Sequence, residues 1–340
     1  MKVKTSLDVS AREWDDIVLQ CGGSFFHTYA YAAFEASKSH QKPAFIQLLD
    51  ANDNCYGVAV ACIETPKIWP FSAYCKKAIF GALPVAKTAK LLNIFMLKIE
   101  AELKSMGVFN IFHHAYESEN SHEILSTLKY QLNNRSEFYI PLDKTEDELW
   151  KALKSSRRRN IRKAEKLNIE SKFETTLDAI ISLKNLQENA LARKGVVTSN
   201  NIHIAERIKS VLVDHSRAIT VTSYHKNKPL NAALFGFYNE KVYYIISGSS
   251  LEGNKVSGPA HMLWHAICEF KDMGYNRVNL GGVSESESLN QAGLYRFKKD
   301  FGAEIISQPS GEKLISVLGV ALNQIELKIK HLLKRTFKKY

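Results

Sequence analysis

The pattern of apolar and polar positions in the first part of the chain predicts a mixed α/β domain. Two apolar runs, residues 44–49 and 56–64, are separated by the turn sequence DANDN and are typical of a β-hairpin. A strand at 78–81 precedes a long helix at 86–106, which Gly107 ends, and another strand follows at 108–113. Strands and a helix in this order indicate a mixed or parallel sheet with helices on its faces.

The same order of elements returns in the second half of the chain. Strands at 230–238 and 241–247 precede a helix at 258–273, which Gly274 ends, and a strand follows at 277–280. The sequence ELKSMG, which ends at Gly107, is similar to EFKDMG, which ends at Gly274, 167 residues later. We therefore interpret the fold as α/β with mixed sheets, in two tandem domains related by internal duplication, over residues 1–142 and 143–317.

Positive charge is concentrated in two segments. Residues 150–169, WKALKSSRRRNIRKAEKLNI, predict a single helix with an apolar stripe, preceded by a capping box of Thr145 and Glu148. Residues 151–166 hold eight Lys or Arg and one Glu, a net charge of +7, and residues 326–339 hold six and one, a net charge of +5. The whole chain carries +11, so the other residues are close to neutral. Such concentration indicates a phosphate-bearing partner, although most charge runs are solvated helix faces.

The C-terminal segment, residues 318–340, predicts a basic amphipathic helix outside the two domains. Its apolar residues recur at intervals of three and four, as in Leu318, Leu322, Ile325 and Ile329, and lysines flank them. This pattern is typical of a helix that lies in a membrane interface. Packing against the second domain produces the same pattern, and the sequence leaves both interpretations open.

The composition is that of an ordinary globular protein, with 45% hydrophobic and 24% charged residues. The five cysteines are odd in number and include no CxxC pair, so neither a disulfide framework nor a zinc ribbon is indicated. The first residues resemble no signal peptide, and the longest apolar run, 55–63, is too short to span a membrane. These features predict a cytoplasmic protein whose membrane contact, if any, is peripheral at the inner face.

Four segments resemble a known family. They are SFFHTYAYAAF at 24–34, RRRNIRKAEK at 157–166, LFGFYNEKVYY at 234–244 and LYRFKKDFG at 294–302. Together they are similar to the Fem-type (FemAB-like) peptidyltransferases and their acyltransferase relatives, which pair two domains of the GCN5-related N-acetyltransferase (GNAT) fold. The resemblance implies transfer of an acyl or aminoacyl group to an amine on a peptidoglycan precursor or, in relatives, on other envelope or polysaccharide substrates.

The resemblance does not decide whether the donor is acyl-CoA or aminoacyl-tRNA. In either case the donor would be a co-substrate rather than a tightly bound cofactor. Members that use aminoacyl-tRNA often carry a long coiled-coil arm, whereas this chain has only a short helix pair at 177–214. A CoA-dependent member would have a glycine-rich loop before its central helix, and this chain has NKVSGPA there. Ser257 and Gly258 of that sequence are candidate donor-binding residues.

The resemblance also implies two of the three catalytic candidates, Lys298 and Phe297. Lys298, which follows Phe in RFKKDFG, would stabilise charge at the reacting carbonyl or donor phosphate, and Phe297 would shape the floor beside it. A surface lysine on an amphipathic helix is the competing interpretation. Glu285, in the loop after Gly281 and Gly282, could accept the amine proton or simply belong to a polar loop.

The arginine-rich helix supplies the candidates for phosphate contacts, because guanidinium groups match phosphate oxygens. They are Arg158, Arg159, Arg162 and Lys163. His261 and His265 have a spacing that a zinc site could use, but no third ligand accompanies them, so we expect a packed or hydrogen-bonded pair and no metal.

These observations predict an N-acyltransferase that acts on an amine of a cell-envelope or polysaccharide precursor. Its partners would be a phosphate-bearing donor and a sugar- or peptide-type acceptor. One alternative is a tRNA-dependent aminoacyltransferase that adds an amino acid to a peptidoglycan-type precursor. Another is a non-catalytic protein that binds phosphate, nucleic acid or a membrane surface.

Overall fold

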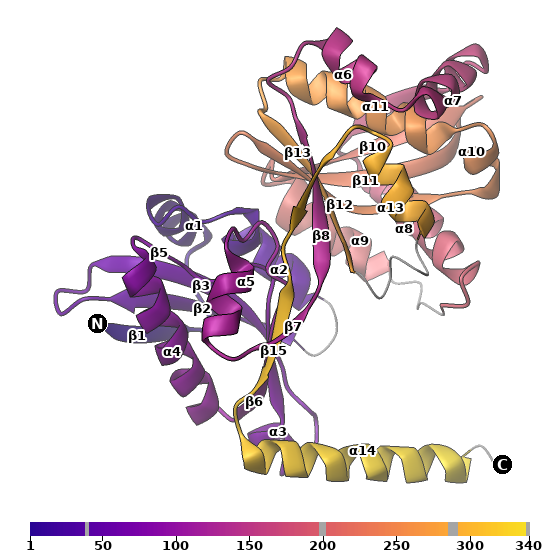
Figure 1. The fold of residues 1–340 in the computed structure, drawn as a ribbon. Coiled ribbons are helices and arrows are strands. Elements are labelled where there is room, and N and C mark those ends of the chain that lie inside the picture. The colour runs from indigo at the N-terminus through magenta and orange to yellow at the C-terminus, as the bar shows by residue number, and fades with distance from the viewer. Residues whose placement is uncertain (38–40, 197–201, 285–291, 338–340) are drawn as a thin grey trace. The chain divides into compact units, whose positions relative to one another are not determined.

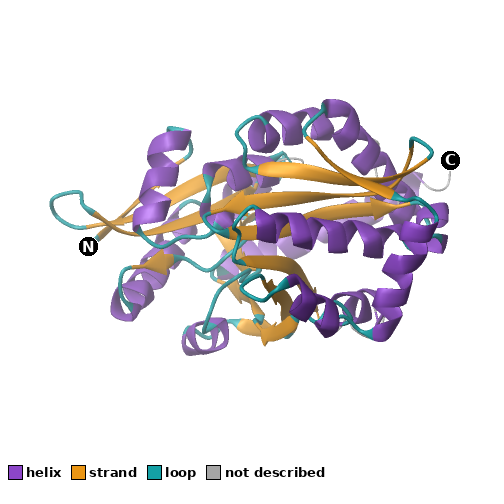
Figure 2. Cartoon of the chain, turned by 90° about the horizontal axis from the view of Figure 1, so that it is seen from above, coloured by secondary structure: helices purple, strands orange, loops and turns teal. Residues whose placement is uncertain are grey.

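The computed structural model describes residues 1–37, 41–196, 202–284 and 292–337 (Figure 1). The chain forms two compact units, the first from residues 1–134 with 308–340 and the second from residues 135–307. Each unit contains a mixed sheet with flanking helices, as Figure 2 shows in orange and purple. The predicted α/β fold with two mixed sheets is therefore confirmed.

The first unit has the strand order β1-β2-β3-β4-β6-β15-β7, with β5 paired to β3. Within the described chain its neighbouring strands are antiparallel except β4 and β6, which are parallel. Its strands are β1 (Lys2–Ser6), β2 (Gln41–Leu49), β3 (Cys55–Glu64), β4 (Lys76–Phe80), β5 (Val85–Ala86), β6 (Val108–His113), β7 (Gln131–Asn133) and β15 (Ser310–Leu314). Its helices are α1 (Ala11–Gln20), η1 (Phe25–His27), α2 (Tyr29–Ala36), α3 (Phe71–Tyr74), α4 (Ala89–Ser105), α5 (Ser121–Thr127) and α14 (Val317–Phe337).

The second unit has the strand order β14-β8-β13-β12-β11-β10-β9, and its parallel pair is β12 with β13. Its strands are β8 (Arg135–Pro141), β9 (Glu170–Glu174), β10 (Ala218–His225), β11 (Lys228–Tyr238), β12 (Lys241–Ser249), β13 (Arg277–Ser284) and β14 (Glu304–Ser307). Its helices are α6 (Glu146–Ala152), α7 (Ser155–Lys166), α8 (Leu177–Ala192), α9 (Ile202–Ile208), the π-helical η2 (Lys209–Val213), α10 (Leu251–Lys255), α11 (Gly258–Asp272) and α13 (Ala292–Lys299).

The two sheets repeat one topology, which supports the predicted duplication. When the second sheet is read from β9, its order matches that of the first sheet strand for strand, and the parallel pairs occupy the same place. A helix precedes the second strand of each parallel pair, α4 before β6 and α11 before β13. Both helices are followed by a glycine with φ +85°, Gly107 and Gly274. This left-handed conformation ends a helix at little cost only when the residue is glycine.

Two strands, β8 and β15, each belong to the other unit than the predicted domain bounds imply. Strand β8 lies before residue 142, the predicted end of the first domain, but pairs with β13 and β14 of the second sheet. Strand β15 lies between β6 and β7 of the first sheet and leads α14 back to the first unit. The divisions therefore fall at 134/135 and 307/308, not at 142/143 and 317/318. The apolar alternation of a strand specifies which face is buried but not which sheet it joins, so sequence alone could not place these strands.

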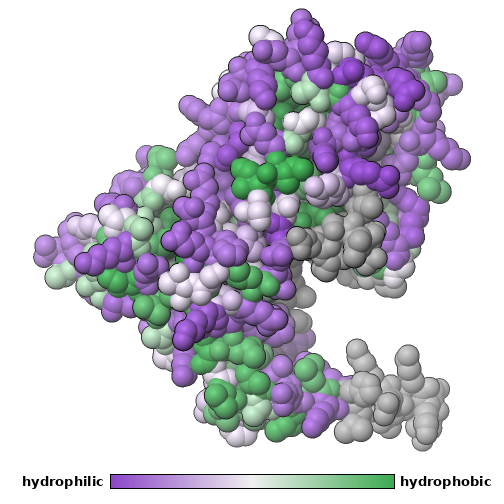
Figure 3. Space-filling view, in the orientation of Figure 1, coloured by the Kyte–Doolittle hydropathy of each residue, from purple (hydrophilic) through white to green (hydrophobic). Residues whose placement is uncertain are grey.

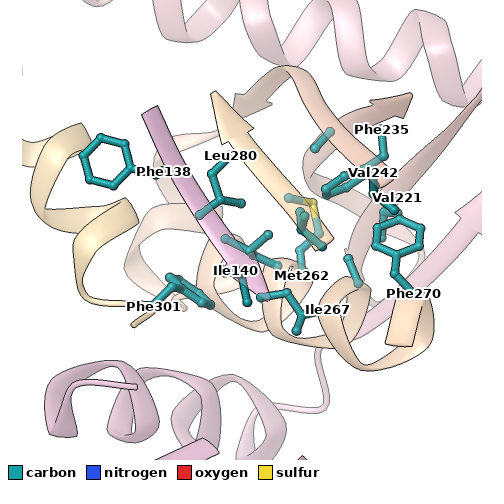
Figure 4. Packing of buried hydrophobic residues seen from close by; sticks show 14 of the residues in the cluster. Phe138, Ile140, Val221, Phe235, Val242, Met262, Ile267, Phe270, Leu280 and Phe301 are labelled. Carbon is teal, nitrogen blue, oxygen red and sulfur yellow. The ribbon is translucent and has the colours of Figure 1, made fainter. Parts of the chain in front are cut away.

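The core of the second unit lies between its sheet and α11. Figure 4 shows Met262, Ile267 and Phe270 of this helix packed on strand residues such as Val221 and Val242. All five side chains are buried. Helix α8 contacts β11 and β12 on the opposite face of the sheet (Figure 1). A sheet covered on both faces fixes its strand ends rigidly, and these ends carry the candidate site described below.

We predict that Gly107→Ala destabilises the protein much more than Gly274→Ala does. Both positions have φ +85°, which costs an alanine about 1 to 2 kcal/mol. A Cβ atom at Gly107 would also lie 1.7 Å from the carbonyl oxygen of Ala73, whereas one at Gly274 would meet no atom within 4 Å. We expect a loss of at least about 3 kcal/mol for the first variant. Urea unfolding followed by circular dichroism measures the free energy of unfolding of both variants. Equal losses of stability would contradict the steric argument.

Candidate functional site

A bulge in β13 organises the candidate site in the second unit. The pairing of β13 with β8 loses register between Asn279 and Gly282. Leu280 and Gly281 therefore oppose the single residue Phe138. Gly281 has φ +74°, and its N–H donates to Oδ1 of Asn279 at 2.7 Å. A bulge changes the direction of the backbone groups and side chains that follow it, which is why bulges recur beside active sites.

Lys298 reaches this bulge from α13. Its side chain is only 6% exposed, and Nζ donates to the carbonyl oxygen of Gly282 at 3.1 Å. The same Nζ lies 5.7 Å from the centre of the Phe138 ring. The neighbouring Lys299 is exposed. The interpretation of Lys298 as a surface lysine is therefore wrong, and the two adjacent lysines occupy different environments.

The parallel strands β12 and β13 part beside the bulge. Within the described residues they pair only as far as Tyr243 and Asn279, although they run on to Ser249 and Ser284. At the same level Ile245 is an extra residue of β12 relative to β11. Strands that part in the middle of a sheet can offer backbone N–H and C=O groups to an extended ligand. The parting thus provides a place for a donor or acceptor chain next to the bulge that Lys298 contacts.

A buried charged cluster on β8 supports the bulge from the other side. Arg135, Glu137 and Tyr139 share one face of the strand, because side chains two residues apart point the same way. Glu137 is fully buried, and its Oε1 lies 2.8 Å from Nη2 of Arg135. The hydroxyl of Tyr139 and, at 3.3 Å, Nδ2 of Asn279 donate to Oε2 of Glu137.

The cluster holds the same residue whose carbonyl Lys298 contacts. A Cβ atom at Gly282 would lie 1.9 Å from Nη2 of Arg135, so the guanidinium group rests directly on this glycine. The sequence analysis missed Arg135 and Glu137. Their signal was two charges on one face of a strand whose other face is apolar, which is unusual unless the charges are paired.

The predicted helix over 150–169 is two helices, α6 and α7, and Arg158 explains the break. The capping box of Thr145 and Glu148 is present and begins α6. The helix ends because Leu153 is extended, with ψ 137°. At this end of α6, Nη1 of Arg158 donates hydrogen bonds to three backbone carbonyl oxygens. They belong to Trp150, Lys151 and Leu153. This use within the fold differs from the phosphate contact predicted for Arg158.

The beginning of α7 packs against the end of α13. The guanidinium group of Arg157 lies 4.7 Å from the centre of the Phe297 ring and 3.6 Å from Oδ2 of Asp300. Burial lowers the pKa of Arg157, and the carboxylate of Asp300 partly offsets that effect. The backbone N–H of Lys154 donates to the carbonyl oxygen of Asp300 at 2.9 Å. These contacts fix Phe297, beside Lys298, against the arginine-rich helix.

The remaining basic residues of α7 line an open hollow of about 440 Å³. Its lining consists of Arg159, Arg162, Lys163, Lys166 and Leu167. Arg162 lies over the Trp150 ring at 5.4 Å, and Nζ of Lys163 donates to the carbonyl oxygen of Lys255 at 2.7 Å. A concave surface with four cations attracts phosphate groups. Three of the four predicted phosphate-binding residues therefore lie together here.

The contact of Lys163 with Lys255 connects this hollow to the turn that begins α11. Ser257 is left-handed, with φ +64°, and Gly258 starts the helix. A Cβ atom at Gly258 would lie 2.1 Å from Oδ1 of Asn231, so packing already requires glycine at this position. The donor-binding role of Ser257 and Gly258 stays a prediction. The basic helix α7 contacts the residues just before this turn.

Two further sequence predictions have different outcomes. Glu285 lies outside the described residues. His261 forms the expected hydrogen-bonded contact, with Nδ1 3.0 Å from Oγ of Ser171, and its ring stacks with that of His265. Burial and the neighbouring His265 lower the pKa of His261. Among the described residues no group of three potential metal ligands occurs.

Comparison with known proteins agrees with this architecture. The FemAB family model matches residues 198–312, a segment that contains β12, β13 and Lys298. The aminoacyltransferase FemB of Staphylococcus epidermidis is 35% identical over 88 residues, which are 25% of this chain and 20% of that protein. The crystal structure of FemX superposes with a TM-score of 0.73 at 16% identity, over 96% of this chain and 99% of that one. The chain is thus similar to the Fem-type, GNAT-like family, in sequence over residues 198–312 and in fold over nearly its whole length.

More distant structures share the fold of this chain. A tandem GNAT protein from the clavulanic acid biosynthesis pathway superposes with a TM-score of 0.55 at 8% identity, over 93% of this chain and 99% of that one. A structure named L-PGS from Bacillus licheniformis superposes with a TM-score of 0.56 at 10% identity, over 96% and 97%. These likenesses confirm two GNAT-like domains. The sequence match to FemB spans only about a fifth of that protein's length.

We predict that Arg158 and Arg159 have separate roles. Arg158→Ala should lower the free energy of unfolding by about 1 kcal/mol, because it removes a charged donor from the carbonyl groups at the end of α6. Arg159→Ala should change it by less than about 0.5 kcal/mol, since this residue is exposed. Urea unfolding measures both values.

Arg159→Ala should instead weaken the binding of inorganic pyrophosphate and reduce the salt dependence of that binding. Isothermal titration at two salt concentrations measures this effect, and Lys299→Ala serves as a control for simple loss of one exposed charge. An unchanged affinity of Arg159→Ala for pyrophosphate would indicate that the hollow is an ordinary solvated surface.

Proposed function

We propose that this Fem-type protein transfers an aminoacyl group to an amine of a peptidoglycan-type precursor. The observation that carries the proposal is Lys298, buried against the β13 bulge at the point where β12 and β13 part. The match of residues 198–312 to the FemAB family and the local similarity to an aminoacyltransferase support it.

The proposed chemistry is attack of the acceptor amine on the ester carbonyl of the donor. Negative charge develops on the carbonyl oxygen as the new C–N bond forms, and the bond to the leaving hydroxyl then breaks. A cation fixed beside that oxygen stabilises the charge without having to reorganise, and burial strengthens the interaction. We assign this role to Lys298, with Phe297 as the apolar floor beside it. Glu285 stays our predicted acceptor of the amine proton.

The hollow on α7 would hold phosphate groups of the donor or of the acceptor. An aminoacyl-tRNA and a nucleotide-linked precursor both bring phosphates, so the proposal requires the cations that line the hollow. Transfer from an acyl-CoA to an envelope or polysaccharide precursor is the second candidate, favoured by the tandem GNAT fold. A protein that only binds phosphate or nucleic acid would have no use for a buried lysine at a strand bulge, and we regard that function as the weakest of the three.

We predict that Lys298→Met lowers kcat by about 10²- to 10³-fold while the affinity for the acceptor stays nearly unchanged. A cation at the reacting carbonyl acts mainly in the transition state, so its loss affects turnover more than binding. Transfer is measured by intact mass of a nucleotide-linked precursor that carries a free amine, with aminoacyl-tRNA and acetyl-CoA offered as donors in separate reactions.

Lys299→Met is the matched control, because it removes the same charge from the next position of α13, where the side chain is exposed. It should retain activity close to that of the unaltered protein. Equal activity of the two variants would remove Lys298 from the mechanism. Transfer from acetyl-CoA alone would favour the second candidate function.

We further propose that α14 and the segment before α3 contact an anionic membrane surface. None of the helices in the described part of the chain is long and apolar enough to cross a membrane. The first turns of α14 pack on the first unit, where Val320 and Leu322 contact the cluster of Phe71, Cys75 and Phe109. The predicted alternative, in which this helix packs against the second domain, is therefore wrong.

Exposed apolar side chains remain beside this packed part. Leu318, Ile325 and Ile329 lie along one stripe of α14 and are all exposed. Ile68 and Trp69, immediately before α3, are 69% and 77% exposed. Figure 3 shows apolar side chains gathered around α3 and the start of α14. An exposed tryptophan beside an apolar stripe with flanking lysines suits the interface of an anionic bilayer.

We predict that Trp69→Ser combined with Ile325→Ser reduces sedimentation with phosphatidylglycerol vesicles at least tenfold. Both substitutions remove apolar area that would enter the interface, while neither side chain supports the core. Leu97→Ser on α4 is the control, since Leu97 is 54% exposed on another element of the same unit. Undiminished sedimentation of the double variant, or equal sedimentation of the unaltered protein with neutral phosphatidylcholine vesicles, would contradict the proposal.

A further inference from the structure

Two of the five cysteines lie together in the first unit, far from the candidate active-site residues in sequence. Cys21 follows the last residue of α1, and Cys55 is the first residue of β3. Their Sγ atoms are 4.0 Å apart, with the thiol of Cys21 donating to the sulfur of Cys55. The odd number of cysteines and the lack of a CxxC pair gave no sign of this contact. It arises because α1 packs against β3, whose first residue, Cys55, follows the turn of the β2–β3 hairpin.

We propose that Cys21 and Cys55 form a reversible disulfide, in which Cys55 reacts first with an oxidant and Cys21 resolves the product. Their separation is already close enough that a change of side-chain rotamer can bring the sulfurs to bonding distance. Cys55 is partly exposed and can meet a small oxidant, whereas Cys21 is buried beside it. This pairing of an accessible thiol with a buried neighbour is the arrangement of a redox-responsive site.

The electrostatic surroundings favour the same order of reaction. The hydrogen bond from Cys21, with smaller contributions that include the positive charge of Lys87, lowers the pKa of Cys55 to about 6 against the opposing effect of burial. The shared contact and burial raise the pKa of Cys21 above its ordinary range. The lowered pKa favours the thiolate form of Cys55, which is the form that attacks a disulfide.

The reaction balances with a low-molecular-weight disulfide, RSSR, as oxidant. The Cys55 thiolate attacks one sulfur of RSSR, forms a mixed disulfide and releases RS⁻. Cys21 then loses its proton, attacks Sγ of Cys55 and expels the second RS⁻. Two protein thiols are oxidised to one disulfide, and RSSR is reduced to two thiols. A bond between these residues would tie the end of α1 to the start of β3.

The other three cysteines lack these features. Cys62 and Cys75 are buried, and their thiols donate to the backbone carbonyl oxygens of Ala32 and Gly319. Burial, together with acidic neighbours such as Glu146 and Asp272, raises the pKa of Cys268 to about 12. Cys268 is partly exposed, like Cys55, and so provides the matched control for accessibility without a lowered pKa.

The test uses the full chain, incubated at neutral pH with oxidised glutathione and followed by intact mass and peptide mapping. We expect loss of two hydrogens and a peptide pair joined through Cys21 and Cys55, restored by reduced glutathione. Cys21→Ser should instead keep glutathione on Cys55, Cys55→Ser should form neither product at these positions, and Cys268→Ser should behave as the unaltered chain.

A mixed disulfide that persists on Cys55 in the unaltered chain would overturn the proposal, as would a bond that joins any other pair. Absence of reaction at Cys55 would overturn it as well. Circular dichroism of each serine variant checks that the fold is retained. The readout is independent of transferase activity, so this result and a failure of the proposed function remain distinguishable.

Discussion

The pairing of β8 with β13 is the interaction on which the candidate site depends. It creates the bulge at Leu280 and Gly281 and presents the carbonyl group of Gly282 to Lys298. Strand β8 is the first strand of the second unit and precedes α6, whereas its partner β13 comes near the end of that unit. The second sheet therefore cannot form its site from a contiguous segment that starts at α6. Such long-range pairing closes large loops and is expected to form late in folding.

The same pairing also explains why a charge cluster is buried beside the site. Removing Glu137 and Arg135 from water is costly, and a buried ion pair is weak evidence for stability by itself. Here the carboxylate accepts from Tyr139 and Asn279 as well, so its oxygens are bonded from both strands. The pair specifies the register across the bulge, because a shift by one residue would leave the charges without these partners. We infer that the cluster is retained for the geometry that it imposes on Gly282 rather than for its net free energy.

Local patterns predicted the elements well, and long-range contacts account for what they missed. A helix pair was predicted at 177–214, and its first helix is α8, which begins at residue 177 as predicted because the apolar spacing and the Thr176 cap are local. The break between α6 and α7 was missed because both sides carry helical patterns, and the cap that separates them comes from Arg158 in the next helix. Lys298 and Lys299 are indistinguishable by residue type. Only the packing of α13 on the bulge makes one buried and the other exposed.

The duplicated topology also shows why the site belongs to the second unit. In the first unit the equivalent parallel strands, β4 and β6, stay paired to their ends at Phe80 and His113. The antiparallel pairing of β6 with β15 has no loss of register, so no bulge corresponds to the one at Gly281. The equivalent strands of the second unit part after Tyr243 and Asn279. One fold thus occurs twice in this chain. The parallel strands stay paired to their ends in the first copy, whereas in the second copy they part beside an extra residue in β12 and a bulge in β13. Since fold alone does not determine function, these local irregularities, rather than the shared topology, distinguish the copy in which we propose the active site.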